Sequence, residues 1–226
     1  MGEKATLAQF KALLGARHSC RAFLPEPVDA ARIEAMIEAA QKVPSWCNAQ
    51  PWQLVVTRGR ATEAFRAAMQ RAMAEATARP DIPFPAAYEG VYRERRRECG
   101  WQLYDSVGVA RGDRAASALQ MAENYRFFGA PHVAVVTTEA ALGAYGVLDC
   151  GAFVTAFLLA AEAEGIAAIA QAAIAAYGAE VRAHFGLPGN RQVVCAIAFG
   201  HEDRDHPANG FRTTRAGLEE VVDWRG

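Results

Sequence analysis

The stretch VLDCGAFVTAFLLAAEAE, residues 147–164, decides the fold. Its middle, AFVTAFLLAA, carries almost no polar side chain, and Gly165 ends the run. A helix that is apolar on every side is buried inside a protein rather than laid on its surface. We therefore expect a central, buried helix, and its apolar character hints that a partner subunit completes the burial.

Strand patterns lie on both sides of this helix in the chain. Residues 133–138 form a β-branched run, and its continuous apolarity is typical of a strand that is buried on both faces. Residues 53–57 and 193–199 are expected to form further strands. Residues 166–170 form either a short strand or a loop.

Helical patterns occupy most of the remaining chain. Residues 5–15 carry apolar side chains at helical spacing, and Asp29 can cap a second helix that ends before Pro44. Further helices are expected over residues 61–78, 91–100, 114–125 and 173–185, and residues 216–224 form a short helix or an extended arm. The chain shows no regular βαβ alternation, no repeat and no linker. The sequence therefore predicts one α+β domain over residues 1–226, which ends in a C-terminal arm over residues 200–226.

Composition excludes several classes of protein. The 226 residues are 52% hydrophobic, and 24 basic residues against 25 acidic ones give a net charge of -1. This is the usage of an ordinary globular chain, and it gives no reason to expect nucleic acid or a membrane as a partner. The five cysteines form no CxxC pair, and neither a signal peptide nor a charge-free apolar run of about 18 residues is found. We expect a reduced, cytoplasmic protein.

The common motifs of nucleotide-binding and hydrolytic enzymes are missing from the sequence. It contains no GxGxxG, Walker A, GxSxG or HExxH motif, which disfavours a Rossmann unit and a serine hydrolase. The stretch HEDRDH, residues 201–206, is rich in possible metal ligands. A solvated turn is the favoured interpretation of this stretch, and we expect no metal site.

Two clusters of donors lie at opposite ends of the chain. The first, RHSCR over residues 17–21, follows a helix end, and the second, RTTR over residues 212–215, lies near the C-terminus. Guanidinium groups match phosphate oxygens bidentately, so the two clusters can converge on one phosphate. On composition alone, a surface turn with ion pairs explains the first cluster equally well.

The segment PSWCNAQPW, residues 44–52, offers another kind of recognition. Its carboxamides, Asn48 and Gln50, can both donate and accept hydrogen bonds, and the flanking prolines keep the chain extended. Such groups suit the edge of a heterocycle. The alternative is a rigid loop in which Trp46 and Trp52 only fill the core.

Four stretches together carry a resemblance to a known family. RHSCRAF, PSWCNAQPW, FFGAPHVAVV and NGFRTTRAGLEEVVDW occur in this order, and the match runs from about Gly15 to Trp224. In this respect the chain resembles the FMN-dependent nitroreductase family. The resemblance implies a nitroreductase-like flavoprotein fold, with a central mixed sheet flanked by helices, built as an intertwined homodimer with FMN at the subunit interface.

The resemblance also implies roles for particular residues. By position, the N-terminal cluster resembles the phosphate and ribityl ligands of the family, and Arg215, assisted by Arg212, matches its C-terminal phosphate ligand. A second set resembles the stretch that lines the isoalloxazine from the partner subunit. The N-terminal set is Arg17, His18, Ser19 and Arg21, and the ring-lining set is Pro44, Ser45, Trp46, Asn48 and Gln50.

One stretch departs from the family pattern. Gln171, Ala172 and Ala173 occupy the place where a backbone N–H approaches flavin N5, and relatives commonly have Pro-Gln with a Gly there. Backbone donation tolerates this change, although the register of the contact is open by a residue or two.

The implied activity is a ping-pong transfer of two electrons from NAD(P)H to a nitroaromatic or quinone-like acceptor. Flavin N5 carries the chemistry, so no catalytic residue is expected from the chain itself. The alternatives are a same-fold reductive dehalogenase or other flavin redox enzyme, a non-catalytic FMN-binding protein, and a cofactor-free interaction protein.

The segment over residues 79–114 has the character of an insertion. Long segments of this kind form lids or binding elements, and this one combines aromatic side chains with arginines. We expect it to pass over the active site, with Tyr88 and Tyr92 covering a planar substrate and Arg96 meeting an acidic substituent. The alternative is a solvated helix whose arginines pair with Glu94 and Glu98.

Overall fold

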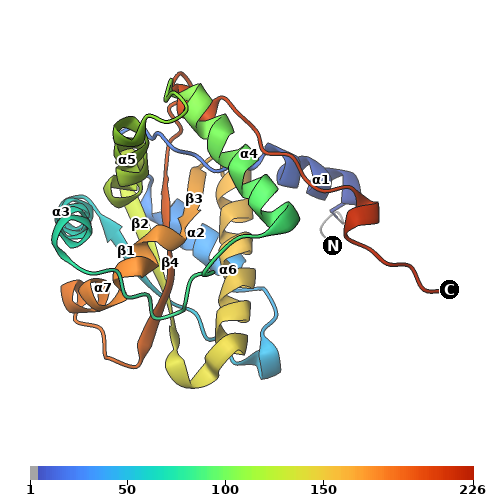
Figure 1. The fold of residues 1–226 in the computed structure, drawn as a ribbon. Helices are drawn as coiled ribbons and strands as arrows, with labels where there is room; N and C mark the ends of the chain where they lie inside the picture. The colour runs from blue at the N-terminus through green and yellow to red at the C-terminus, as the bar shows by residue number, and fades with distance from the viewer. Residues whose placement is uncertain (1–4) are drawn as a thin grey trace.

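A single antiparallel sheet organises the fold (Figure 1). The computed structural model describes residues 5–226, so the first four residues of the expected domain lie outside the described part. The strands are β1 (Gln53–Arg58), β2 (His132–Glu139), β3 (Ala167–Gln171) and β4 (Arg191–Gly200), and their order in the sheet is β1-β2-β4-β3. Each neighbouring pair is antiparallel.

The two central strands are buried on both faces. On β2, Val133 and Val135 belong to one hydrophobic cluster, whereas Ala134 and Val136 belong to the other. This alternation explains why the run was continuously apolar in the sequence: neighbouring side chains point to opposite faces, and both faces are covered.

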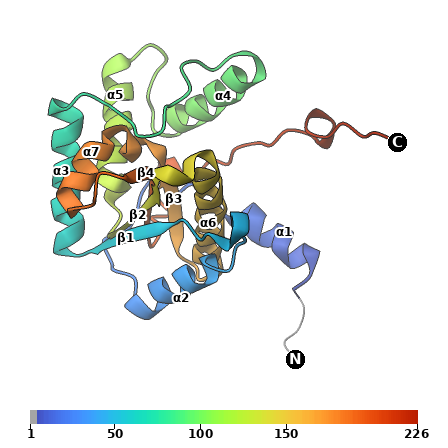
Figure 2. The same ribbon diagram turned by 90° about the horizontal axis from the view of Figure 1, so that it is seen from below.

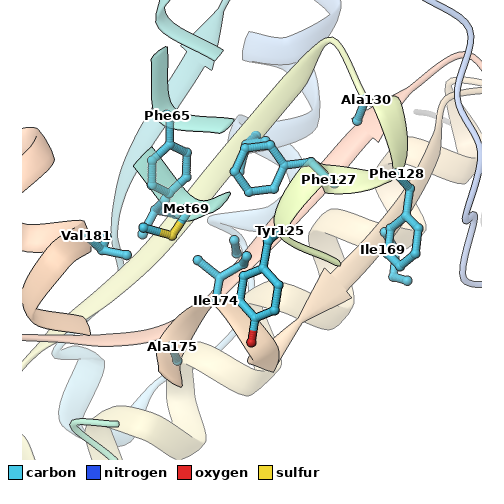
Figure 3. Packing of buried hydrophobic residues seen from close by; sticks show 14 of the residues in the cluster. Phe65, Met69, Tyr125, Phe127, Phe128, Ala130, Ile169, Ile174, Ala175 and Val181 are labelled. Carbon is cyan, nitrogen blue, oxygen red and sulfur yellow. The ribbon is translucent and has the colours of Figure 1, made fainter. Parts of the chain in front are cut away.

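Helices cover the two faces of the sheet. Helices α2 (Ala30–Ala40) and α6 (Gly143–Ala163) pack on one face, and α3 (Arg60–Glu75) and α7 (Gly178–Phe185) pack on the other (Figure 2). Figure 3 shows the second cluster, in which Phe65 and Met69 of α3 meet Phe127, Ile174 and Val181.

The remaining elements lie around these layers. Helix α1 (Leu7–Ala16) and the C-terminal arm project from the same side of the molecule, as Figure 2 shows. Two further helices, α4 (Gly90–Ser106) and α5 (Arg114–Ala122), follow α3 in the chain. Short 3-10 turns are η1 (Trp46–Asn48), η2 (Glu123–Gly129), η3 (Ala140–Leu142), η4 (Ala172–Tyr177), η5 (Pro207–Asn209) and η6 (Leu218–Glu220).

Helix α6 is buried on one face only, so the expectation of a fully buried helix is wrong for the single chain. Phe153 and Phe157 are buried, but Leu148 on the opposite face is 65% exposed. By length and composition alone, the stretch Ala140–Ala163 is apolar enough to span a membrane, with a mean hydropathy of 1.7. Its aromatic face packs on the sheet, and core helices meet the same criterion.

Most of the expected fold is confirmed. The fold class is α+β. Residues 166–170, for which the sequence left a strand and a loop open, belong largely to strand β3. The sheet was expected to be mixed, but within residues 5–226 a parallel pairing is found only at an isolated bridge between Ser19 and Ala168. The helix expected over residues 173–185 is divided into η4 and α7, and residues 216–224 are extended apart from η6.

Candidate functional site

Backbone pairing brings the N-terminal cluster to the edge of the sheet. Ser19 forms a parallel bridge with Ala168 of β3, and Phe23 forms an antiparallel bridge with Glu202. The N–H of Leu24 donates to the carbonyl of His201 at 2.9 Å. The turn over residues 17–21 is therefore fixed where β3 and β4 meet.

Asn209 attaches the other end of the chain to the same place. Its Oδ1 accepts the backbone N–H of Arg21 at 2.6 Å, and its Nδ2 donates to the carbonyls of Ala22 and Asp203 at 3.0 and 2.8 Å. The side chain is buried. Because Asn209 precedes the RTTR cluster, this one carboxamide brings both donor clusters together.

The two clusters enclose a cavity of about 300 Å³. Four guanidinium groups, an imidazole and two hydroxyls line it, and no carboxylate is found among its described lining residues. The sequence assigned roles to six of these residues and included Thr213 only as part of the RTTR cluster. It gave no sign of Leu14, Gly15, Cys99 and Phe211. The lining residues are Leu14, Gly15, Arg17, His18, Ser19, Arg21, Cys99, Phe211, Arg212, Thr213 and Arg215.

Backbone carbonyls, rather than carboxylates, hold most of the cavity arginines. Within residues 5–226, none of the four cavity arginines forms an ion pair. Carbonyls hold three of them instead. Arg21 donates to Ser19 at 3.1 Å and Arg212 donates to Asn209 at 2.7 Å. Arg215 donates to the carbonyl of Thr214 at 2.7 Å. Burial, together with the charge of Arg215, lowers the pKa of Arg17, and burial lowers the pKa of Arg21. The cavity therefore favours an anion.

His18 lines the cavity with both ring nitrogens turned toward protein acceptors. Its Nε2 lies 2.8 Å from Oε1 of Glu202, and its Nδ1 lies 3.4 Å from the carbonyl of Ala16. Sequence reasoning considered Glu202 only as a metal ligand and missed this contact. Among the described residues no group of three or more metal-ligating side chains is found.

The segment over residues 44–50 lies away from this cavity. Trp46 is 62% exposed, and its indole contacts the ring of Tyr145 of α6 in a tilted arrangement, with the ring centroids 4.8 Å apart. Trp52 is buried against Phe153, so only the second tryptophan fills the core. Asn48 and Gln50 are exposed and have positive φ angles of 55° and 48°.

The stretch expected near flavin N5 ends strand β3. The buried Gln171 donates from Nε2 to the carbonyl of Asn124 at 2.9 Å, which holds its side chain inward. Ala172 is exposed and Ala173 is half-buried. None of the three lines the arginine cavity of the same chain.

Helix α4 packs against the C-terminal arm across a second cavity of about 620 Å³. Arg95 pairs with Glu220 at 2.9 Å, and the hydroxyl of Thr214 donates to Glu98 at 3.0 Å. The pairing of the helix arginines with Glu94 and Glu98, which was the alternative interpretation, is not found within residues 5–226. The partners lie on the arm, which the sequence pattern of one helix does not reveal.

The residues expected to meet substrate lie on the surface at the start of this helix. The guanidinium of Arg96 lies over the ring of Tyr88, 5.3 Å from its centroid, and Tyr92 is 68% exposed. The preceding loop is fixed at its base, because Asp81 accepts hydrogen bonds from Arg182 and from the N–H of Val193.

The chain is similar to known proteins over nearly its whole length. A sequence profile of the Nitroreductase family matches residues 14–201. The chain is 36% identical over 227 residues to nitroreductase NfnB of Mycolicibacterium smegmatis, covering 98% of this chain and 95% of that protein. It is 30% identical over 217 residues to a 4-nitrobenzoate reductase of Pseudomonas putida, covering 96% of each.

A solved structure is similar over nearly the whole length. The FMN-dependent nitroreductase NfnB from Mycobacterium smegmatis, solved in complex with NADPH, superposes with a TM-score of 0.93. Its sequence identity is 35%, and the match covers 98% of this chain and 100% of that one.

Proposed function

This chain belongs to the nitroreductase family, and from that premise we propose that it is an FMN-dependent oxidoreductase. It passes two electrons from NAD(P)H to a nitroaromatic or quinone-like acceptor. The observation that carries the proposal is the cavity to which both ends of the chain contribute arginines. Three relatives of at least 30% identity align with nearly the whole chain, namely nitroreductase NfnB and two 4-nitrobenzoate reductases, and one NfnB structure was solved with NADPH.

The chemistry of the cavity fits the phosphate of FMN. Phosphate oxygens accept bidentate hydrogen bonds from guanidinium groups, and a hydroxyl adds a further donor. Arg17 and Arg215 repel each other across the cavity, and a bound anion relieves that repulsion. The phosphate would be held by the arginines and one hydroxyl of the cavity, namely Arg17, Ser19, Arg21, Arg212 and Arg215. His18 lines the same cavity, with its nitrogens facing Glu202 and Ala16.

The flavin ring is assigned to other parts of the chain. Pro44, Ser45, Trp46, Asn48 and Gln50 line the isoalloxazine from the partner subunit, and the backbone around Gln171, Ala172 and Ala173 approaches N5. Bound FMN supplies the transfer of hydride and electrons between NAD(P)H and the acceptor, so no side chain is assigned as catalytic. The chain binds and orients the ring, and it excludes water from it.

A homodimer completes this site. Large apolar side chains are exposed on the projecting elements, and a second copy covers them. Leu148 on α6 is 65% exposed and Trp224 on the arm is 79% exposed. The other exposed members of this set are Leu7, Phe10, Leu14, Tyr145, Leu218 and Val221.

The substrate is a small aromatic oxidant, and residues near α4 select it. Tyr88 and Tyr92 are exposed aromatic side chains that cover a planar ring, and Arg96 meets an acidic substituent. The 4-nitrobenzoate reductase among the relatives supports an acidic nitroaromatic as one candidate. A cytoplasmic setting without membrane or nucleic-acid partners is also part of the proposal, and the net charge of -1 supports it.

Steady-state turnover tests the proposal. The purified protein is expected to be yellow and to oxidise NADH or NADPH in the presence of nitroaromatics and quinones. A yellow protein without turnover would indicate a non-catalytic flavin-binding protein. Turnover restricted to halogenated aromatics would indicate a dehalogenase, and a colourless protein that does not bind added FMN would indicate a cofactor-free role.

A further inference from the structure

Asp149 is a buried carboxylate on an otherwise apolar helix. It is 8% exposed and lies on the core face of α6, beside Cys150 and one turn before Phe153. Burying a charged group costs several kcal/mol unless hydrogen bonds compensate it. The structure shows such a bond, because Oδ2 of Asp149 accepts the backbone N–H of Trp46 at 3.0 Å.

Trp46 begins a turn with an unusual backbone. Cys47, Asn48 and Gln50 have φ angles of 51°, 55° and 48°. Left-handed conformations cost residues with a Cβ about 1–2 kcal/mol each, and such strain persists only where the surroundings hold it. Inside the turn, Ser45 accepts the N–H of Gln50 through Oγ at 2.9 Å and the N–H of Asn48 through its carbonyl at 3.0 Å.

Helix α6 holds the turn from outside. Among the described residues, the bond from Trp46 to Asp149 is the only hydrogen bond that joins residues 45–50 to another element. The indole of Trp46 rests on Tyr145, which lies one helical turn before Asp149. The backbone and the side chain of Trp46 are thus both fixed to the same helix.

We propose that Asp149 is a positioning residue for flavin binding. By accepting the Trp46 N–H it holds the turn over residues 45–50 with its three left-handed residues in place, and this presents the Asn48 carboxamide to the flavin ring. The inference rests on the proposed function, which assigns Asn48 to the ring. Asp149 acts through hydrogen bonding and touches neither flavin nor substrate.

The test separates binding of the ring from binding of the phosphate. Asp149→Leu removes the acceptor at similar size, Asp149→Asn keeps one acceptor oxygen, and Thr155→Val removes an exposed hydroxyl from the same helix as a control. Affinities are measured for FMN, for riboflavin, which lacks the phosphate, and for inorganic phosphate as a competitor of FMN.

Asp149→Leu is expected to weaken riboflavin and FMN binding about tenfold and to leave phosphate competition within about twofold of the original chain. Asp149→Asn and Thr155→Val are expected to stay within about twofold for all three ligands. Riboflavin affinity that is unchanged in Asp149→Leu, or equally weakened in Asp149→Asn, would overturn the assignment.

A second pair of variants applies if Asp149→Leu does not fold. Trp46→Ala keeps the backbone N–H and Trp46→Pro removes it, and the extended Ser45 tolerates a following proline. The proline variant is expected to bind riboflavin about tenfold more weakly than the alanine variant, and equal affinities would contradict the role of Asp149.

An unmodified chain that binds no FMN would overturn the proposed function, and this inference with it. A chain that binds FMN but is insensitive to these changes would overturn this inference alone.

Discussion

Arg17 and Arg215 come from opposite ends of the chain and face one cavity with Arg21 and Arg212. Like charges at short range destabilise one another, and partial burial of Arg17 adds a desolvation cost. Such a cluster is unfavourable for an empty protein and favourable for a phosphate-binding one. The arginines therefore identify the ligand class more directly than any other residues of the chain.

The first prediction concerns these arginines. A charge-assisted hydrogen bond contributes about 1.5–3 kcal/mol, so Arg17→Ala and Arg215→Ala are each expected to weaken FMN binding roughly 10- to 100-fold. Fluorescence titration of the apoprotein measures this. Arg60→Ala, an exposed arginine at the start of α3, is the control, and wild-type affinity in both cavity variants would contradict the phosphate site.

At the scale of single residues, the sequence predicted which kinds of side chain line the site. It did not predict which residues contact one another. The RHSCR and RTTR clusters stood out because dense donors suit an anion, but composition alone did not bring the two ends together. That depends on Asn209 and Glu202, whose partners lie almost a whole chain length away. The left-handed backbone at Cys47 and Asn48 also gave no local signal, since glycine is the residue that normally marks such positions.

At the scale of secondary-structure elements, the side chain of His132 joins strand β2 to Val28 and to Thr57 of strand β1. The buried imidazole accepts the N–H of Val28 at Nε2 over 2.9 Å, and its Nδ1 lies 3.3 Å from the carbonyl of Thr57. Both contacts are satisfied by the neutral ring with its proton on Nδ1. Burial lowers the pKa of His132 below its ordinary value of 6.5.

The second prediction is a pH dependence of stability that follows from this shift. Below about pH 6.5 the unfolded chain binds a proton at this position that the folded chain does not yet bind. The contribution of His132 to the free energy of unfolding is therefore complete above about pH 6.5 and declines as the pH falls toward the lowered pKa. Thermal unfolding across this range is expected to show a shallower decline for His132→Gln. An unchanged slope would contradict the assignment, although His184, whose pKa burial also lowers, leaves part of the slope in place.

Helix α4 leads to the third prediction. Tyr88→Ala and Tyr92→Ala are expected to change kcat/KM ratios among nitroaromatics while the FMN content stays full, because these exposed rings lie outside the phosphate cavity. Steady-state kinetics with acidic and neutral nitroaromatics measure the ratios. If the ratios hold constant and flavin occupancy falls, the segment has a structural role instead.

Elements with strong periodicity were predictable, and those set by tertiary contacts were not. The local sequence patterns of β2 and α6 were enough to predict a strand and a helix. The short run after Gly165 forms a strand because it pairs with β4 in the folded chain.

Phe127 and Phe128 adopt left-handed backbone angles before β2. Aromatic residues rarely do so, and Arg66 stabilises this turn by donating to the carbonyls of Arg126 and Ala130.

On the scale of the whole molecule, the proposed homodimer would cover the exposed apolar face of α6 and the projecting ends. As the fourth prediction, Leu148→Glu is expected to shift the protein from dimer to monomer and to release flavin, since a carboxylate placed in an apolar interface is left unpaired. Sedimentation velocity with detection of flavin absorbance measures both effects. A stable, flavin-loaded monomer of the unmodified chain would contradict the dimeric site.

The most direct test of the central claim follows the bound flavin through both half-reactions without oxygen. The FMN-loaded protein is mixed with NADPH or NADH, and a nitroaromatic is added once the reductant is consumed. We expect the visible absorption of the flavin to be bleached by at least one nicotinamide and restored by the nitroaromatic, with two electrons transferred per flavin. A flavin that neither nicotinamide reduces, or that is reduced but not reoxidised by nitroaromatics or quinones, would contradict the account.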